Sequence, residues 1–335
     1  MAKAMKKPSL FCKVSFPALS ALLLAAGMTQ TAVAANYDNW PERTVTMVIP
    51  FAPGGPTDVT GRLLAEELAK IWGQSVIVEN RAGAGGTIGA ANTARAPKDG
   101  YTIILGVTGS HGIAGSLYKD LAYDPAEDFE AVSKVVIYPN AIFAHPSLPA
   151  DNLEELIELV KENSDYGIYG TDGNGTASHL TMELLAERAG IDLDAVQYKG
   201  STPLITDVVG GFTQYGITGL PSVEQHLSDG NVKLIAITTD QDYSNRGLKT
   251  IAEQGFPGFA AAPWSGIFAP KGTPKPVVEK MANDIKVVLS SEEITKKLNA
   301  LGLTPMPLTL EEFEADLEKE RESWAKAVEI ADINP

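Results

Sequence analysis

A glycine-rich loop between a strand-like and a helix-like segment occurs twice near the start of the chain, and it limits the fold more than any other feature. The first loop spans residues 50–58 after the apolar run 45–49, and the second spans residues 80–89 after residues 75–78. Such a junction leaves free backbone N–H groups and the positive end of a helix dipole at one point. Two such junctions predict an anion site built from backbone, and a carboxylate is the expected guest.

The rest of the chain alternates between strand-like and helix-like segments, which is typical of an α/β protein with largely parallel sheets. Further Gly/Ser/Thr loops at residues 173–176 and 200–202 again join a strand pattern to a helix pattern. The four junctions predict two α/β lobes that face each other across a ligand cleft and close on the ligand. Strand patterns also recur at residues 102–106, 132–143, 212–218 and 232–238, and helix patterns at 58–71, 151–163, 277–289, 292–300 and 310–331.

Three helix starts carry capping signals. Asp151 and Glu154 have the spacing of a capping box at the start of the helix pattern 151–163. Thr309 and Glu312 have the spacing of a capping box, which predicts a helix from residue 310. Thr202 followed by Pro203 has the pattern of an N-cap and a first helical residue.

Residues 1–34 have the pattern of a cleavable signal peptide. Four lysines precede or flank the apolar run 16–26, and residues 32–34 form a small-x-small cleavage site. Cleavage near Ala34 and a periplasmic location are therefore expected. The single cysteine, Cys12, lies in this segment, so the mature protein is expected to contain no disulfide and no cysteine metal site. No other segment is expected to cross a membrane.

With a formal net charge of −15, the chain lacks the excess of positive charge that binding to nucleic acid requires. Affinity for an anion must come from short-range, directed donors, because the repulsive field is screened beyond ~8 Å at physiological ionic strength. The four histidines lack metal-binding spacing, and Ile88 stands where a dinucleotide fingerprint needs its third glycine. We therefore expect neither a metal nor a cofactor.

A periplasmic hydrolase is an alternative function, because Ser110 lies beside His111. The Gly-x-Ser-x-Gly pattern is absent, since Thr108 occupies its first glycine position, and neighbours in sequence make a poor nucleophile–base pair. A protein without enzymatic activity is therefore expected. A ligand sensor that docks on a signalling receptor is a third reading, and it shares all its binding chemistry with a transport receptor.

Short motifs spread in order along the chain carry a family resemblance. They include residues 40–43 (WPER), 50–58 (PFAPGGPTD), 79–89 (ENRAGAGGTIG), 96–101 (APKDGY), 173–175 (GNG), 198–201 (YKGS), 220–222 (LPS) and 264–270 (WSGIFAP). In these motifs the chain resembles the periplasmic solute-binding receptors of tripartite tricarboxylate transporters, the Bug family. The resemblance implies a type II periplasmic-binding-protein fold and a large and a small membrane subunit as partners.

The resemblance also implies the division into lobes and the site. Domain 1 would comprise residues 35–137 and 234–335, and domain 2 residues 138–233. Asp58 would support the first glycine loop without touching the ligand. The expected ligand-binding residues are Ala52, Pro53, Gly54, Gly55 and Thr57; Ala84, Gly85, Gly86 and Thr87; Thr108, Ser110 and His111; Gly175, Thr176 and His179; Lys199, Gly200 and Ser201; Thr218; and Trp264.

The chain departs from the family pattern in its middle third. Gln214 and Thr218 stand where many relatives have aspartate, and Asp172 replaces a more usual serine. The loss of the first two carboxylates favours a plain carboxylic acid over an amino acid, because an ammonium group would lose its partners. We expect a small organic carboxylate, with a dicarboxylate or an aromatic carboxylate favoured, and Lys199 as a candidate partner for a distal acid group.

Overall fold

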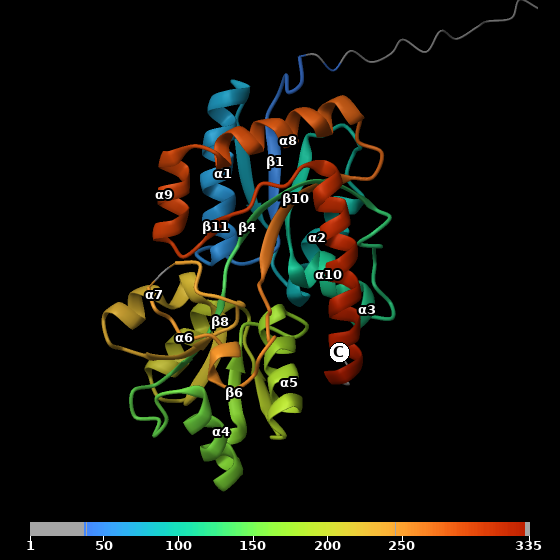
Figure 1. The fold of residues 1–335 in the computed structure, drawn as a ribbon. Helices are drawn as coiled ribbons and strands as arrows, with labels where there is room; N and C mark the ends of the chain where they lie inside the picture. Colours follow the sequence, from blue (N-terminus) through green and yellow to red (C-terminus); the bar gives the residue numbers. More distant parts are fainter. Residues whose placement is uncertain (1–36, 38, 245, 332–335) are drawn as a thin grey trace, which may run out of the picture. The chain divides into compact units, whose positions relative to one another are not determined.

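The computed structural model describes residue 37 and residues 39–244 and 246–331, and it forms two β-sheets with helices on both faces of each (Figure 1). The expected signal peptide and its cleavage site lie outside the described residues. The predicted α/β class is confirmed. The expectation of largely parallel sheets is wrong, because both sheets mix parallel and antiparallel pairs.

The first sheet has six strands in the order β11-β4-β10-β3-β1-β2. Strands β1, β2 and β3 are parallel, whereas β10 runs antiparallel to β3 and β4. The strands are β1 (Val45–Ile49), β2 (Val76–Asn80), β3 (Thr102–Val107), β4 (Phe129–Ile137), β10 (Trp264–Pro270) and β11 (Thr304–Pro305). The helices nearest in sequence to them are α1 (Pro56–Trp72), α2 (Thr87–Ala94), α3 (Ala114–Leu117), α8 (Lys275–Leu289), α9 (Glu292–Ala300) and α10 (Leu310–Ala331).

The second sheet has five strands in the order β7-β6-β8-β5-β9. Strand β6 is parallel to β7 and β8, and β5 is antiparallel to β8 and β9. The strands are β5 (Asn140–Ala144), β6 (Ile168–Thr171), β7 (Asp194–Gln197), β8 (Tyr215–Gly219) and β9 (Lys233–Ile237). The intervening helices are α4 (Leu153–Glu162), α5 (Ala177–Ala189), α6 (Ser201–Val209) and α7 (Leu220–Ser228).

The chain passes between the two sheets twice. The first passage is the short link from β4 to β5, and the second lies between Ile237 and Trp264. The two passages are joined where the N–H of Tyr138 donates to the carbonyl of Pro263 at 3.0 Å. The expected division of the chain placed the residues from 234 onward in the first domain. Strand β9 instead pairs with β5 and therefore belongs to the second sheet.

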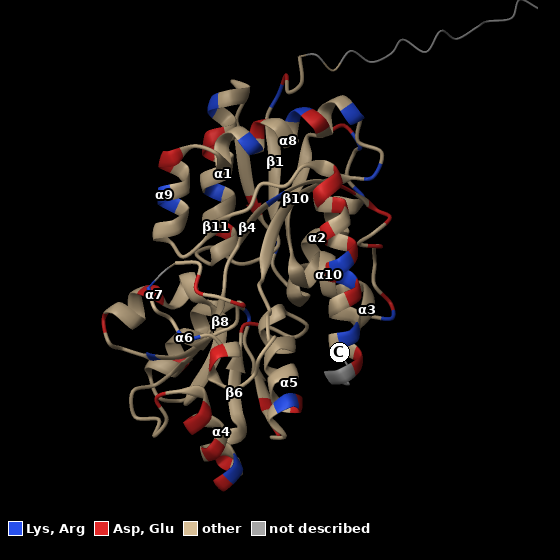
Figure 2. Cartoon of the chain, in the orientation of Figure 1, with Lys and Arg blue, Asp and Glu red and all other residues tan. Residues whose placement is uncertain are grey.

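Burial on both faces explains why the central strands consist almost wholly of apolar residues. In β1, Met47 packs in the same cluster as Leu64 of α1 and Met281 of α8, whereas the adjacent Val48 packs in the cluster that contains Ala90 of α2. Figure 2 shows that charged side chains are concentrated on the helices and loops rather than on the strands. Within the described residues, no helix is both long and apolar enough to span a bilayer.

The capping box predicted at α10 is confirmed: Glu312 accepts from the N–H of Thr309 at 2.9 Å, and the Glu312 N–H donates to the Thr309 hydroxyl. The capping box predicted at Asp151 and Glu154 is wrong, because the N-cap of α4 is Asn152, whose side chain accepts from the N–H of Glu155 at 2.9 Å. The predicted cap of α6 is also wrong. Its N-cap is Gly200, and Ser201 is already helical, so Thr202 and Pro203 lie inside the first turn. The N–H groups that open α6 therefore stand two residues earlier than expected.

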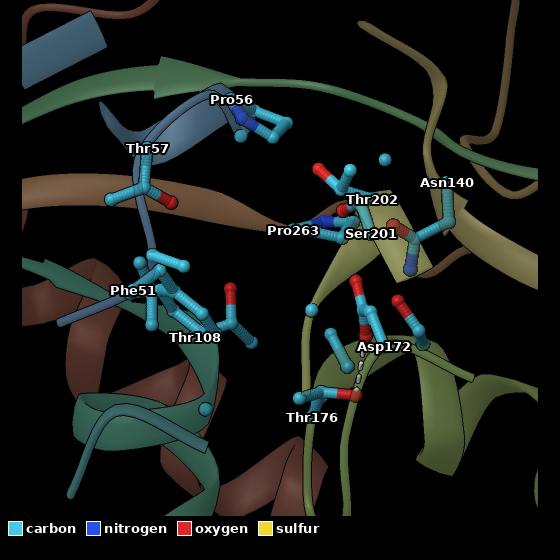
Figure 3. Close-up of a pocket in the computed structure, with 18 of the residues that line it drawn as sticks. Phe51, Pro56, Thr57, Thr108, Asn140, Asp172, Thr176, Ser201, Thr202 and Pro263 are labelled. Atoms are coloured by element: carbon cyan, nitrogen blue, oxygen red, sulfur yellow. Dashed lines mark hydrogen bonds between the residues drawn. The ribbon is translucent and has the colours of Figure 1, made fainter. Parts of the chain in front are cut away.

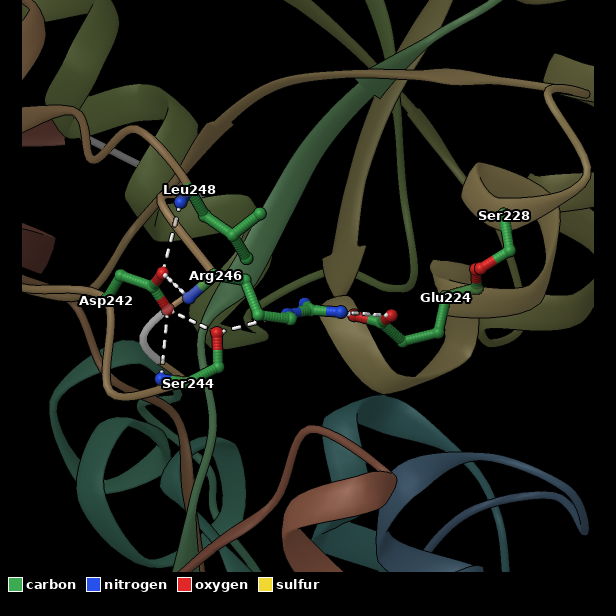
Figure 4. Close-up of polar contacts among 6 residues, drawn as sticks. All are labelled: Glu224, Ser228, Asp242, Ser244, Arg246 and Leu248. Atoms are coloured by element: carbon green, nitrogen blue, oxygen red, sulfur yellow. Dashed lines mark hydrogen bonds and ion pairs between the residues drawn. The ribbon is translucent and has the colours of Figure 1, made fainter.

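A polar network holds the long passage after β9 against α7 (Figure 4). Arg246 donates two hydrogen bonds of 2.6 Å to the carboxylate of Glu224 on α7. Asp242 accepts from the backbone N–H groups of Arg246 and Leu248 at 2.7 and 3.0 Å. Bidentate arginine–carboxylate pairs are among the stronger polar contacts, and this pair fixes a segment that has little regular structure.

A buried ion pair joins α10 to the first sheet, and its loss is expected to destabilise the fold. Lys134 of β4 is 5% exposed and donates to Asp316 at 2.7 Å. Asp316→Asn leaves the buried ammonium group with a weaker partner, so we expect the free energy of unfolding to fall by ~1–3 kcal/mol in urea titrations. Glu279→Gln, which breaks the exposed pair between Lys275 and Glu279, is the control and should cost less than ~1 kcal/mol. Equal effects of the two substitutions would contradict this interpretation.

Candidate ligand-binding site

A cavity of about 100 Å³, partly open to solvent, lies where the first glycine loop meets the loops of the second sheet (Figure 3). The two passages between the sheets also line it, through Tyr138 and Pro263. The cavity therefore lies at the carboxyl ends of parallel strands, which is the usual position of ligand sites in α/β proteins.

Four helices begin at this cavity. Pro56 and Thr57 open α1, Ala177 and Ser178 open α5, Ser201 and Thr202 open α6, and Gly219 is the N-cap of α7; all of them line the cavity. The first N–H groups of a helix have no intrahelical partner, and the dipole adds positive potential there. The walls therefore attract an anion with backbone groups. Within the part of the chain that the structure describes, Lys199 and Asp172 are the only charged residues that line the cavity.

Asp172 is the acidic group of the cavity, and neighbouring hydroxyl groups hold it. It accepts from the Thr176 hydroxyl at 3.0 Å and from the Thr218 hydroxyl at 2.8 Å. Thr218 also shares a 2.7 Å hydrogen bond with Ser201. Burial raises the pKa of Asp172, and the hydrogen bonds from Thr218, Thr176 and Ser178 partly offset that rise.

Asp58 braces the first glycine loop from behind. Its carboxylate accepts from the N–H of Gly54 at 3.0 Å, from Arg62 at 2.9 Å and from the amide of Asn80 at 2.8 Å. Burial alone would raise the pKa of Asp58, but these hydrogen bonds lower it below its usual value. The Asn80 amide also donates to the carbonyl of Phe51, so β2 fixes both sides of the loop.

The structure brings nine of the predicted ligand-binding residues together around the cavity: Ala52, Pro53, Gly55, Thr57, Thr108, Thr176, Lys199, Gly200 and Ser201. Others that line it did not figure among the sequence-based candidates: Phe51, Pro56, Val107, Gly109, Tyr138, Asn140, Asp172, Ala177, Ser178, Thr202, Pro203, Gly219 and Pro263. Most are immediate neighbours of predicted residues and could have been found by extending each loop. Tyr138 and Asn140 carry no local signal, because only the passage between the sheets brings them to the cavity.

The second glycine loop does not line this cavity, contrary to expectation. Ala84, Gly85, Gly86 and Thr87 instead form a tight turn in which the Thr87 hydroxyl donates to the carbonyl of Ala84 at 2.9 Å. The positive φ angles of Gly85 and Gly86, 61° and 98°, let the turn approach other backbone closely. A Cβ atom on Gly85 would lie 3.1 Å from the carbonyl oxygen of Asn174. The loop therefore packs against the loop that precedes α5.

Ser110, His111 and Trp264 also lie outside the cavity, and each is fully buried. The His111 ring stacks on Phe268 with centroids 3.9 Å apart, and its Nδ1 lies 2.8 Å from the Ser110 hydroxyl. Burial, and secondarily the charge of Arg321, lowers the pKa of His111 to about 3. The Ser110–His111 pair is therefore part of the core, and Trp264 packs between the sheet and α10 rather than at the edge of the cleft.

The remaining predicted residues do not line the cavity: Gly54, Gly175, His179 and Thr218. Gly54 donates to Asp58, and Thr218 holds Asp172. The N–H of Gly175 donates to Nδ1 of His179 at 3.3 Å, and burial lowers the pKa of His179 to about 4. Over the described residues, no group of three or more histidine, cysteine, aspartate or glutamate side chains is placed to hold a metal ion.

Two α/β sheets joined by paired passages, with a cavity between their strand ends, define a two-lobed solute-binding protein. The family model for the tripartite tricarboxylate transporter family receptor matches residues 60–328. The chain belongs to this family of periplasmic binding receptors. The family predicted from the motifs and the predicted fold are confirmed.

Individual relatives support the same assignment. The chain is 35% identical to protein BugT of Bordetella pertussis over 295 residues, which cover 88% of this chain and 90% of that protein. Among solved structures it is similar to Rpa4515 of R. palustris with adipate (TM-score 0.85, 35% identity, 88% and 99% of the two chains). It is also similar to MatC of Rhodopseudomonas palustris with bound malate (TM-score 0.80, 34% identity, 86% and 99%).

The buried His111 is expected to make the fold sensitive to acid. Its pKa of about 3 in the folded protein lies below the ordinary value of 6.5, so the unfolded chain binds a proton that the folded protein excludes. Stability is therefore lost as the pH falls below about 6.5. His111→Asn removes this titrating group. The change in unfolding free energy per pH unit should therefore become smaller by ~1.4 kcal/mol.

The measurement is urea unfolding at several pH values between about 4 and 7, with the partly exposed His145→Asn as the control. The slope is the informative quantity, because the smaller side chain also lowers stability at neutral pH. Parallel curves for His111→Asn and the unmodified protein would show that His111 is not responsible.

Proposed function

We propose that the protein captures a small organic carboxylate in this cavity and delivers it to the large and small membrane subunits of a tripartite tricarboxylate transporter. The observation that carries the proposal is the convergence of four helix starts on a cavity whose largely apolar wall also presents hydroxyl and backbone groups. Membership of the receptor family and the relatives solved with adipate and malate support it.

The proposed binding mechanism is exchange of the ligand's water shell for fixed donors. N–H groups at the starts of α1 and α6 would bind the carboxylate, and the hydroxyls of Thr57, Thr108 and Ser201 would complete its shell. Affinity in the micromolar to sub-micromolar range corresponds to about −8 to −10 kcal/mol. A ligand that touches both lobes stabilises the closed form through its higher affinity for that form.

The location and the lobes form part of the same proposal. Residues 1–34 would direct export to the periplasm and be removed near Ala34. The first lobe would comprise residues 35–137 and the C-terminal part, and the second lobe residues 138–233 together with β9. The preference for a dicarboxylate or an aromatic carboxylate remains a prediction that a ligand screen tests.

The alternatives differ in how well the site supports them. A ligand sensor would use the same cavity and differ only in the protein on which it docks. A hydrolase has little support, because the Ser110–His111 pair is fully buried and apart from the cavity. At the second adjacent pair, Ser178 and His179, the two ring nitrogens of His179 lie within hydrogen-bond distance of Gly175 and Gln197. Recovery of an unchanged ligand after incubation would separate the binding protein from an enzyme.

Gly55→Leu is expected to block the cavity without disturbing the fold. Gly55 has a φ of −83°, which any residue adopts, and a Cβ atom there would meet nothing within 4 Å. In a thermal-shift screen of dicarboxylates, citrate, aromatic carboxylates, hydroxy acids and amino acids, the unmodified protein should be stabilised by ~2.7 kcal/mol at a hundred times the dissociation constant. Gly55→Leu should lose that shift and keep its ligand-free melting temperature.

The exposed Ala300→Leu, at the end of α9, is the matched control and should respond to ligand like the unmodified protein. A flat response of the unmodified protein to every acid would refute the carboxylate function. A shift that survives in Gly55→Leu would place the ligand elsewhere.

A further inference from the structure

We propose that the cavity selects a carboxylate that also carries a hydroxyl group, and that this hydroxyl lies between the side chains of Asn140 and Asp172. The inference rests on the proposed function and names the ligand class for the same cavity. Its basis is a donor and an acceptor that line the cavity from the ends of two strands separated by one, β5 and β6, with β8 between them.

The donor is the side-chain amide of Asn140. This residue lines the cavity and is only 1% exposed, and its Nδ2 has no hydrogen-bond partner among the described residues. Its backbone is fully paired: the N–H donates to the Thr238 hydroxyl at 3.0 Å, and the carbonyl accepts from the Thr238 N–H at 3.1 Å. A buried donor without a partner costs about 1–3 kcal/mol, so a ligand that accepts from Asn140 would relieve that cost.

The acceptor is Asp172. Thr176 donates to one of its carboxylate oxygens and Thr218 to the other. An ionised carboxylate has about four acceptor positions, so two hydroxyl partners, even with Ser178 nearby, leave capacity for a ligand donor. The two threonines also fix the orientation of the carboxylate, which lines the cavity.

Strand pairing places the two side chains at the same edge of the second sheet. Asn140 pairs with Gly219 at the end of β8, and the preceding residue on β8, Thr218, holds Asp172. Asp172 directly follows β6, which pairs with β8 on its other side. Figure 3 shows Asn140 and Asp172 on the same side of the cavity.

A hydroxyl group satisfies both side chains, because it donates to Asp172 and accepts from Asn140. An ammonium group donates only, and it would leave the Asn140 amide without an acceptor. A second carboxylate accepts only, and it would meet the like charge of Asp172. A methyl group would leave the buried Asn140 amide without a partner and the remaining acceptor positions of Asp172 unfilled. The pair thus favours a hydroxy acid over the dicarboxylate expected from the sequence.

Calorimetric titration of the mature protein with matched acids tests the inference. One four-carbon set comprises 4-hydroxybutanoate, 4-aminobutanoate, succinate and butanoate; a six-carbon set and a set substituted at carbon 2 extend it to other positions. In at least one set the hydroxy acid should bind at least ~10-fold more tightly than its three analogues. Asp172→Asn and Asn140→Leu should each remove that advantage, measured as the ratio of the hydroxy-acid affinity to the butanoate-type affinity of the same variant.

The control is Asp120→Asn, which changes an exposed aspartate that does not line the cavity. It should leave all affinities unchanged. If acids bind and Gly55→Leu abolishes their binding, but no hydroxy acid exceeds its analogues, the inference is wrong and the proposed function stands. If Asp172→Asn weakens every acid equally, Asp172 has only a structural role and the inference is also wrong. If no acid binds the unmodified protein, both the function and the inference fail.

Discussion

The rest of the structure depends on the pairing of the two chain passages that run side by side between the sheets. The hydrogen bond from the N–H of Tyr138 to the carbonyl of Pro263 joins these passages. Because these passages are paired, the strand ends of both sheets are held around one cavity. Tyr138 and Pro263 themselves line it. Binding residues that lie far apart in sequence are therefore positioned by main chain rather than by flexible side chains.

Helix starts follow directly from those strand ends, and they give the cavity its electrostatic character. The chain carries a net charge of −15, yet the starts of four helices line one space. Directed donors act within a few ångströms, whereas the field of surface charges is screened over ~8 Å. An acidic protein can thus bind an anion without a cluster of cationic side chains. Lys199 is exposed and lines the cavity.

The polar side chains of the cavity add selectivity to this general attraction. Asp172 is embedded in a hydroxyl network through Thr176, Thr218 and Ser201, and burial raises its pKa. The sequence analysis treated Thr218 as a lost carboxylate and Asp172 as a departure from the family pattern. In the structure the two positions form one unit, in which the hydroxyl of Thr218 orients the carboxylate of Asp172. The two departures therefore compensate for each other.

The sequence by itself determined the local elements, because strand, glycine loop and helix start are set by neighbouring residues. It also identified the family and nine residues of the cavity wall. Only the tertiary structure decided which loops face the ligand. Gly85 and its neighbours have the same local pattern as Gly55, but they pack against the loop before α5. Likewise His111 is a core residue and Asn140 a wall residue, because burial depends on which distant elements pack against a position, and no short segment of sequence encodes that.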